Sequence, residues 1–130
     1  MGVKLANRNK GIFLYGMSED KTEKIEMLSE RLKLRCSRIP KGAGSEKIRN
    51  IVEKKPLKSI QSDAGTISEV LIFNGLNDEE LDVFLKEYKN MGIEPVGLKA
   101  IVTADNSGWT LDELIGELIK ERAAIAFKRI

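Results

Sequence analysis

The order strand, glycine, capped helix and second strand occurs twice in this chain. Residues 12–17 read IFLYGM and residues 71–76 read LIFNGL, and these runs align strand with strand and glycine with glycine. A short apolar run that ends at a turn residue is typical of a buried strand. The same offset places Ser18 over Asn77, and both residue types favour helix N-caps. This repeated order limits the chain to folds in which helices pack on a sheet.

The first unit is predicted to contain two strands, over residues 11–17 and 34–39, and two helices. Ser18 suits the start of the first helix, whose apolar residues then recur at the spacing of one helical face. The turn at residues 41–44 contains two glycines. Ser45 after it is predicted to cap a second helix with a narrow apolar stripe.

The second unit has clearer helix starts, and its strands are predicted over residues 70–73 and 96–103. Both helices begin with a capping box, in which a cap side chain and a Glu three residues later each bond the other's backbone. The pairs are Asn77 with Glu80 and Thr110 with Glu113. Trp109 stands next to the second box at a staple position, so we interpret it as structural.

We therefore predict an α/β protein, with α+β as the neighbouring class, in which two βαβα units form one four-stranded sheet. A ferredoxin-like arrangement is one topology that fits, and a sheet with helices on both faces is the other. We interpret the repeated order as a duplicated unit. The expected organisation is a single domain, 1–130, with units at about 11–55 and 70–122 and a connector at 56–69.

Composition indicates a cytoplasmic globular protein. The chain is 42% hydrophobic and 32% charged, and its one cysteine, Cys36, excludes an intrachain disulfide. No run has the length of a signal-peptide core or a membrane span, so we expect no membrane contact. Residues 1–60 carry 15 Lys and Arg against 7 Asp and Glu, whereas residues 61–130 carry 7 against 13. This polarity favours an anionic partner or head-to-tail self-association.

The second half carries a resemblance. Residues 71–92 read LIFNGLNDEELDVFLKEYKNMG and residues 97–121 read GLKAIVTADNSGWTLDELIGELIKE. This stretch, about Val70 to Glu121, is similar to DUF3783, an uncharacterised bacterial domain family. The family typically has Thr-Pro-Thr-Asn where this chain has Thr103-Ala104-Asp105-Asn106. The resemblance implies no reaction, but it marks Lys99, Asn106 and Trp109 as candidate family-site residues.

The strongest binding candidate in the first half is a glycine-rich turn with basic neighbours. Free backbone N–H groups in such a turn are able to hold a phosphate. The candidate anion-binding residues are Arg38, Lys41, Gly42, Gly44, Ser45 and Lys47. No nucleotide fingerprint is complete here, and glycine is also the usual residue of a helix entry. Few aromatics accompany the basic residues, so the signal for nucleic acid is weak.

Catalytic and metal chemistry have little support, and we predict no catalytic residue, metal or cofactor. The chain has no histidine, and we expect Cys36 to be an inert buried thiol. Lys99 is a candidate site residue in a sheet, or an edge lysine that prevents aggregation. An enzyme site that uses Lys99 with Asp105 is the least favoured hypothesis.

The last helix has two apolar stripes. One contains leucines that suit the core, and the other is a candidate interface made of Ile119, Ala123, Phe127 and Ile130. A helix that is apolar on two faces needs a second partner. We therefore favour a non-enzymatic interaction or regulatory module that binds a protein or a second copy as a homodimer. The alternative is binding of an anion, nucleotide or nucleic acid by the basic first half.

Overall fold

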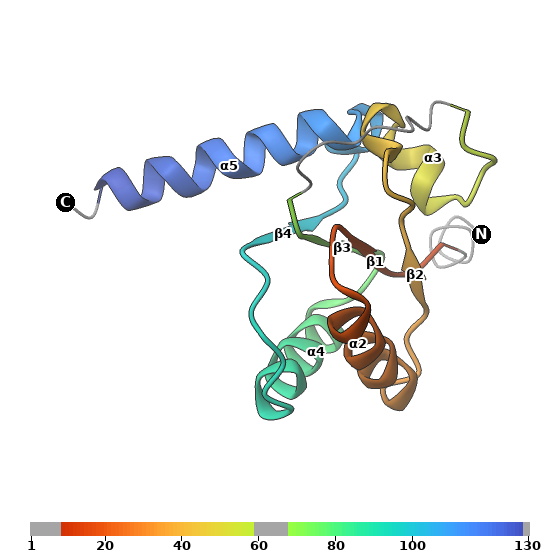
Figure 1. Cartoon of the computed structure of the whole chain (residues 1–130), viewed down its shortest axis with the longest axis vertical. Coiled ribbons are helices and arrows are strands. Elements are labelled where there is room, and N and C mark those ends of the chain that lie inside the picture. The colour runs from red at the N-terminus through yellow and green to blue at the C-terminus, as the bar shows by residue number, and fades with distance from the viewer. Residues whose placement is uncertain (1–8, 59–67, 129–130) are drawn as a thin grey trace.

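The computed structural model describes residues 9–58 and 68–128, with side chains up to residue 123. Within these residues, one four-stranded sheet is formed by β1 (Gly11–Tyr15), β2 (Cys36–Arg38), β3 (Val70–Asn74) and β4 (Leu98–Ile101). The helices of the same residues are α2 (Glu19–Arg31), η1 (Ala43–Ser45), α3 (Ile48–Val52), α4 (Asp78–Asn90), η2 (Asn106–Gly108) and α5 (Leu111–Lys128), where η denotes a 3₁₀ helix (Figure 1). The predicted α/β class is confirmed.

The sheet has the order β2-β1-β3-β4. β1 is parallel to β2 and β3 is parallel to β4, while β1 and β3 pair antiparallel in the centre. A ferredoxin-like fold requires a strand between the two strands of each βαβ unit, whereas here they are direct neighbours. That alternative is therefore wrong. β1 and β3 take the centre because they are the most apolar strands, and β1 is buried along its whole length.

Helices cover both faces of the sheet. Figure 1 shows α2 and α4 on one face and α3 and α5 on the other. Successive strand residues point to opposite faces. Ile12 and Phe73 therefore join the core under α2 and α4, whereas Phe13 and Ile72 join the core under α3 and α5. The second of the two predicted topologies is the observed one.

The two halves have the same order of elements but differ in one length. The sequence offset from β1 to β3 equals that from α2 to α4, whereas the offset from η1 to η2 is larger by four. The second half therefore has four more residues between its first helix and its second strand. At the end of α2, Lys33 has a φ of 59°, and Gly92 at the matching place after α4 has a φ of 69°. The extra residues thus follow this shared turn.

The segments that follow η1 and η2 meet on the α3/α5 face and exchange backbone hydrogen bonds. Ile48 N–H donates to the Trp109 carbonyl, and Leu111 N–H donates to the Glu46 carbonyl, both at 2.9 Å. Lys47 and Thr110 form an isolated antiparallel bridge between these bonds. Residues 46–48 of the first half correspond to residues 109–111 of the second at the offset that relates η1 to η2. Corresponding residues therefore pair with each other here, as they do around a local two-fold axis.

This exchange also explains where the helices start. Both predicted capping boxes are present, in Asn77 with Glu80 and in Thr110 with Glu113. The predicted cap at Ser45 is wrong, because Ser45 ends η1 and α3 begins only at Ile48. Residues 46 and 47 must be extended to bridge the other half, so the helix cannot begin before them.

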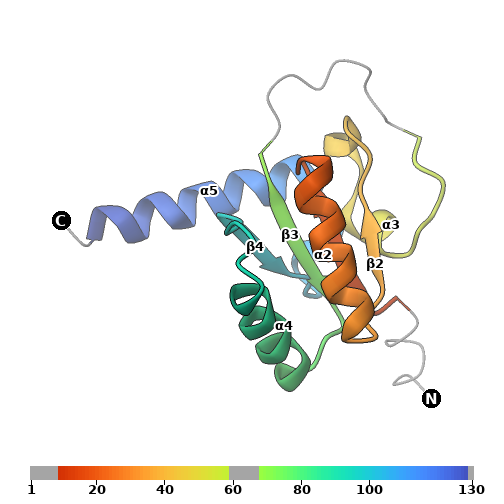
Figure 2. The same ribbon diagram turned by 60° about the horizontal axis from the view of Figure 1, so that its bottom comes forward.

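The last helix extends well beyond the sheet. Figure 2 shows α5 crossing the sheet with its first turns and continuing past β4. Leu111 and Leu114 are buried in the core of that face, and Leu118 packs against it in part. Among the described side chains of α5, those that reach this core therefore come from its first turns.

Candidate functional site

The glycine-rich turn between β2 and α3 faces a carboxylate. Gly42 has a φ of 88°, which suits glycine, and Gly44 lies against the first turn of α5. A Cβ added to Gly44 would clash with a carboxylate oxygen of Asp112. The space beside the Gly44 backbone, which glycine leaves open, is thus occupied by the carboxylate of Asp112. Asp112 disfavours an anion at this backbone.

Arg38, one of the basic residues predicted around this turn, binds two glutamates of α2, whereas Ser45 and Lys47 line a shared pocket. Arg38 binds both carboxylate oxygens of Glu26, at 2.9 and 2.8 Å, and both of Glu19, at 2.9 Å. These hydrogen bonds hold the pKa of Glu26 below its usual range. Arg38 is in register with Leu14, which faces α2. The positive charge of Arg38 is therefore neutralised by glutamates on the α2 side of the sheet, and not at the glycine-rich turn. Lys41, Ser45 and Lys47 are exposed.

Asn106, a candidate family-site residue, organises the end of β4. Its Oδ1 accepts from Thr103 N–H at 2.9 Å, and its Nδ2 donates to the Ile101 carbonyl at 3.0 Å. Val102 between them donates its N–H to Phe73 of β3, so the groups that Asn106 binds point to the outer edge. Asn106 therefore covers the end of this edge strand and has a structural role.

Trp109, the second of these residues, also supports the fold. Its carbonyl accepts the hydrogen bond from Ile48, and its ring packs against the core under α3 and α5. This arrangement agrees with the structural interpretation made from the sequence.

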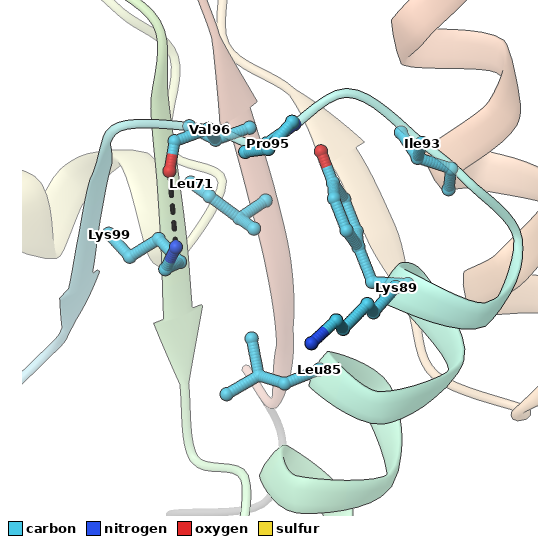
Figure 3. A pocket seen from close by; sticks show the side chains of 8 residues that line it. Leu71, Leu85, Lys89, Ile93, Pro95, Val96 and Lys99 are labelled. Atoms are coloured by element: carbon cyan, nitrogen blue, oxygen red, sulfur yellow. Dashed lines mark hydrogen bonds between the residues drawn. The ribbon is translucent and has the colours of Figure 1, made fainter.

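Lys99, the third, lines a pocket of about 400 Å³ between α4 and β4. We name it the α4–β4 pocket (Figure 3). It is lined by Leu71, Leu85, Tyr88, Lys89, Ile93, Pro95, Val96 and Lys99. Volume and lining match those of small-molecule sites, which are mainly apolar with a few polar groups.

Three side chains hold the wall of the pocket by binding three consecutive carbonyls. Tyr88 of α4 donates to the Glu94 carbonyl, and Lys21 of α2 donates to the Pro95 carbonyl at 3.0 Å. Lys99 of β4 donates to the Val96 carbonyl at 3.1 Å. These carbonyls belong to the four extra residues of the second half. The segment is thus fixed from three different elements, so the pocket is preformed.

Positive charge lies at the mouth of the pocket. Figure 3 shows Lys89 from α4 and Lys99 from β4 reaching toward the same space. Among the residues that the structure describes, neither ammonium forms an ion pair. Burial, followed by the nearby Glu69 and Glu94, raises the pKa of Tyr88 to about 12. Tyr88 therefore stays protonated at neutral pH and serves as a donor.

The first half lacks the four residues that form this wall. Cys36 is in register with Ile12, as Lys99 is with Leu71, so the two residues occupy corresponding positions. Cys36 is half-buried under α2, and burial raises the pKa of its thiol, which disfavours the reactive thiolate. Asp105 is exposed and is not among the residues that line the α4–β4 pocket.

The candidate interface on α5 is only partly described. Ile119 is 48% exposed and Ala123 is exposed, and both line a shallow second pocket beside Gly97 and Leu98. The side chains of Phe127 and Ile130 lie outside the described residues.

Two kinds of feature are absent from the described residues. They contain no group of three His, Cys, Asp or Glu side chains placed to hold a metal ion. Within the same ranges no helix has both the length and the apolar character needed to cross a membrane.

Fold and site together define a three-layer α/β domain with a ligand-sized pocket at one edge of its sheet. Residues 69–125 match the family model of a domain of unknown function, DUF3783. The resemblance seen in the sequence is thereby confirmed. All residues that line the α4–β4 pocket fall within the matched segment. No curated protein and no solved structure matches the chain.

Proposed function

We propose that the chain is a small non-enzymatic interaction or regulatory module that binds a small molecule in the α4–β4 pocket. The supporting observation is a preformed, largely apolar pocket whose charged groups are two lysines. Such a lining suits recognition by apolar contact and charge. A cytoplasmic location, predicted from the single cysteine, is part of this proposal.

An enzyme that uses Lys99 is less well supported. Lys99 donates to the Val96 carbonyl, and the titratable neighbours that line the pocket are Tyr88 and Lys89. A general base needs a pKa near the working pH, and Tyr88 is far above it. Unchanged turnover by Lys99→Ala in any assay that detects activity would exclude this hypothesis.

A fragment screen tests the binding function. NMR spectra of the full chain with small apolar and amphipathic molecules should show shifts concentrated at residues 85–99 for some of them. Leu85→Trp should weaken those fragments by filling the pocket, whereas Val83→Trp, at an exposed position of α4 outside it, should not. If every fragment that binds leaves residues 85–99 unperturbed, the α4–β4 pocket is not a binding site.

Self-association through α5 is the second part of the proposal. It is supported by the exposed side chains of Ile119 and Ala123 on α5, a helix that continues past β4 (Figure 2). Exposed apolar side chains on a projecting helix favour contact with a protein, here a second copy.

Light scattering at high concentration tests this contact. The full chain should form dimers, and both Ile119→Lys and a chain that ends at Arg122 should remain monomeric. Glu121→Lys is the control for a new charge on exposed α5 and should keep the dimer. A monomeric full chain would remove the self-association part.

Binding of an anion, nucleotide or nucleic acid by the basic first half is a weaker alternative. Arg38 is compensated by two glutamates, and Asp112 lies at Gly44. A thermal-shift screen with nucleotides and oligonucleotides at low salt would reveal it as a rise in Tm. An unchanged Tm with all of them would exclude it.

A further inference from the structure

We infer that the ligand of the α4–β4 pocket is a small organic monoanion, with one carboxylate on an apolar body of about ten to fifteen non-hydrogen atoms. This inference rests on the proposed binding function. The size follows from the volume of about 400 Å³, since one water molecule occupies roughly 30 Å³ of liquid and is close in size to one such atom.

The apolar body is required by the floor and walls of the pocket. Leu71 is buried in β3, and Ile93 and Val96 are buried in the segment that follows α4. Leu85 adds a partly exposed side chain from α4. A ligand that covers these side chains removes apolar surface from water, which is the main favourable contribution to binding at such a site.

The negative charge is required by the two lysines. Lys99 gives one N–H to the neutral Val96 carbonyl and keeps two further donors, and Lys89 has no partner within the described ranges. The nearby Lys21 does not add to this charge, because it is paired with Glu69 at 2.8 Å. The two lysines thus outnumber Glu94, the one nearby carboxylate that is not paired with Lys21, and the net positive charge at the mouth is complementary to a carboxylate.

The exposure of the lysines fixes the orientation of the ligand. Lys89 and Lys99 are exposed, so a carboxylate between them remains in contact with water while its apolar body enters the pocket. Two lysines beside Glu94 leave one net positive charge at the mouth, which a monoanion neutralises and a dianion such as a phosphate monoester exceeds. The lining therefore favours a monoanion over a phosphorylated ligand.

Titration calorimetry of the full chain with octanoate, 1-octanol and octyl phosphate tests the inference. Octanoate should bind one site, and it should bind more tightly than either of the other two probes. Lys89→Met should weaken octanoate about three- to tenfold, which is the range of a solvent-exposed charged contact, and should leave 1-octanol unchanged. Lys89→Met is preferred to a change at Lys99, because Lys99 also holds the Val96 carbonyl.

Lys86→Met is the matched control, since Lys86 is exposed on the same helix and does not line the pocket. It should leave octanoate binding unchanged. Equal binding of octanoate and 1-octanol, with no effect of Lys89→Met, would overturn the monoanion inference and leave the binding function intact. If octanoate and 1-octanol both leave the NMR signals of residues 85–99 unperturbed while other fragments perturb them, the inferred ligand class is wrong. If no molecule perturbs them, the proposed function fails first.

Discussion

At the scale of single residues, Gly44 shows how a glycine that is typical of phosphate-binding turns can serve packing. Gly44 is buried in η1, and the Asp112 carboxylate of α5 lies in the space that a side chain at position 44 would need. The matching residue of the second half is Ser107, whose side chain fits and donates to the Ala104 carbonyl. The need for glycine thus comes from α5, and it is invisible in the local sequence.

Gly44→Ala should therefore destabilise the chain by about 1–3 kcal/mol, the usual cost of overpacking. Urea unfolding of the variant provides the measurement. Adding Asp112→Ala should recover most of the loss, because it removes the atoms that clash. Gly108→Ala is the control, since a Cβ there meets nothing within 4 Å. Equal stability of Gly44→Ala and the parent chain would contradict the observed packing.

Arg38 illustrates a charge whose partners only the fold reveals. Its hydrogen bonds lower the pKa of Glu26 in the folded state. A lowered folded pKa contributes stability above the unfolded value of about 4.3, and this contribution is lost as the pH falls through the folded pKa. The pair therefore favours the folded state at neutral pH and ceases to do so in acid.

Arg38→Met should flatten the acid limb of the stability profile. Urea unfolding at steps from pH 7 to pH 3 should show a smaller fall for the variant than for the parent chain. The lowered pKa values of Glu80 and Glu113 affect both proteins alike, so the difference isolates Arg38. Parallel profiles would mean that the pair makes no net contribution in solution.

At the scale of elements, helix starts are set by short local signals. The Asn77 side chain accepts from Glu80 N–H at 2.8 Å, and the Glu80 side chain accepts from Asn77 N–H at 2.9 Å. Both donors would otherwise lack a partner in the helix. This reciprocal bonding depends on four consecutive residues, which is why the sequence predicts it well.

Asn77→Ala should cost about 1 kcal/mol of unfolding free energy, since it removes the cap of α4. Chemical denaturation followed by circular dichroism measures it. Asn90→Ala at the other end of α4 is the matched control and should change little, because that side chain is exposed and its amide lies 3.5 Å from Glu87. A loss at Asn90 as large as at Asn77 would show that capping is not the cause.

The helix α5 contains a residue that opposes its own secondary structure. Gly116 lies in the second turn of the helix, and a Cβ there meets nothing within 4 Å. Glycine inside a helix costs roughly 0.5–1 kcal/mol relative to alanine. Gly116→Ala should raise the free energy of unfolding by about that amount and increase helicity by circular dichroism. A destabilised variant would indicate that a partner approaches this position closely.

At the scale of the whole molecule, the halves are related by a local two-fold axis. Phe13 pairs with Ile72 in the centre of the sheet, and Lys47 pairs with Thr110 on the α3/α5 face. In each pair the two residues occupy matching positions of the two halves, so both pairs lie on the axis. The two halves thus meet at matching positions in both places.

The isolated fragment 69–130 should therefore form a two-fold dimer in which β3 pairs antiparallel with its own copy, centred on Ile72. Burial of the exposed β3 edge and of both cores provides the driving force. Light scattering and circular dichroism should report a folded dimer. Ile72→Lys should give an unfolded monomer, because Ile72 is buried beside the axis. A folded monomeric fragment would contradict the proposed equivalence of the halves.

Much of the fold could be predicted from the sequence, whereas the site could not. Residues 12–15 and 70–73 are continuous apolar runs, and buried central strands need just such runs. The sequence marks Lys99 as a candidate residue, but it does not predict the pocket that Lys99 lines. One signal for this pocket is the sequence offset between η1 and η2, which is larger by four than the offset between β1 and β3. The four additional residues are those that form the pocket wall.

The repeated order of strand, glycine and capped helix determined the α/β class by itself, because turn residues, capping boxes and apolar runs act over a few neighbouring residues. Only the tertiary structure decided the strand order, the late start of α3 and the partners of Gly44, Arg38 and Lys99. Each of these depends on contacts that the local sequence pattern does not encode. The α4–β4 pocket is of this kind, since its wall is held by side chains from α2, α4 and β4.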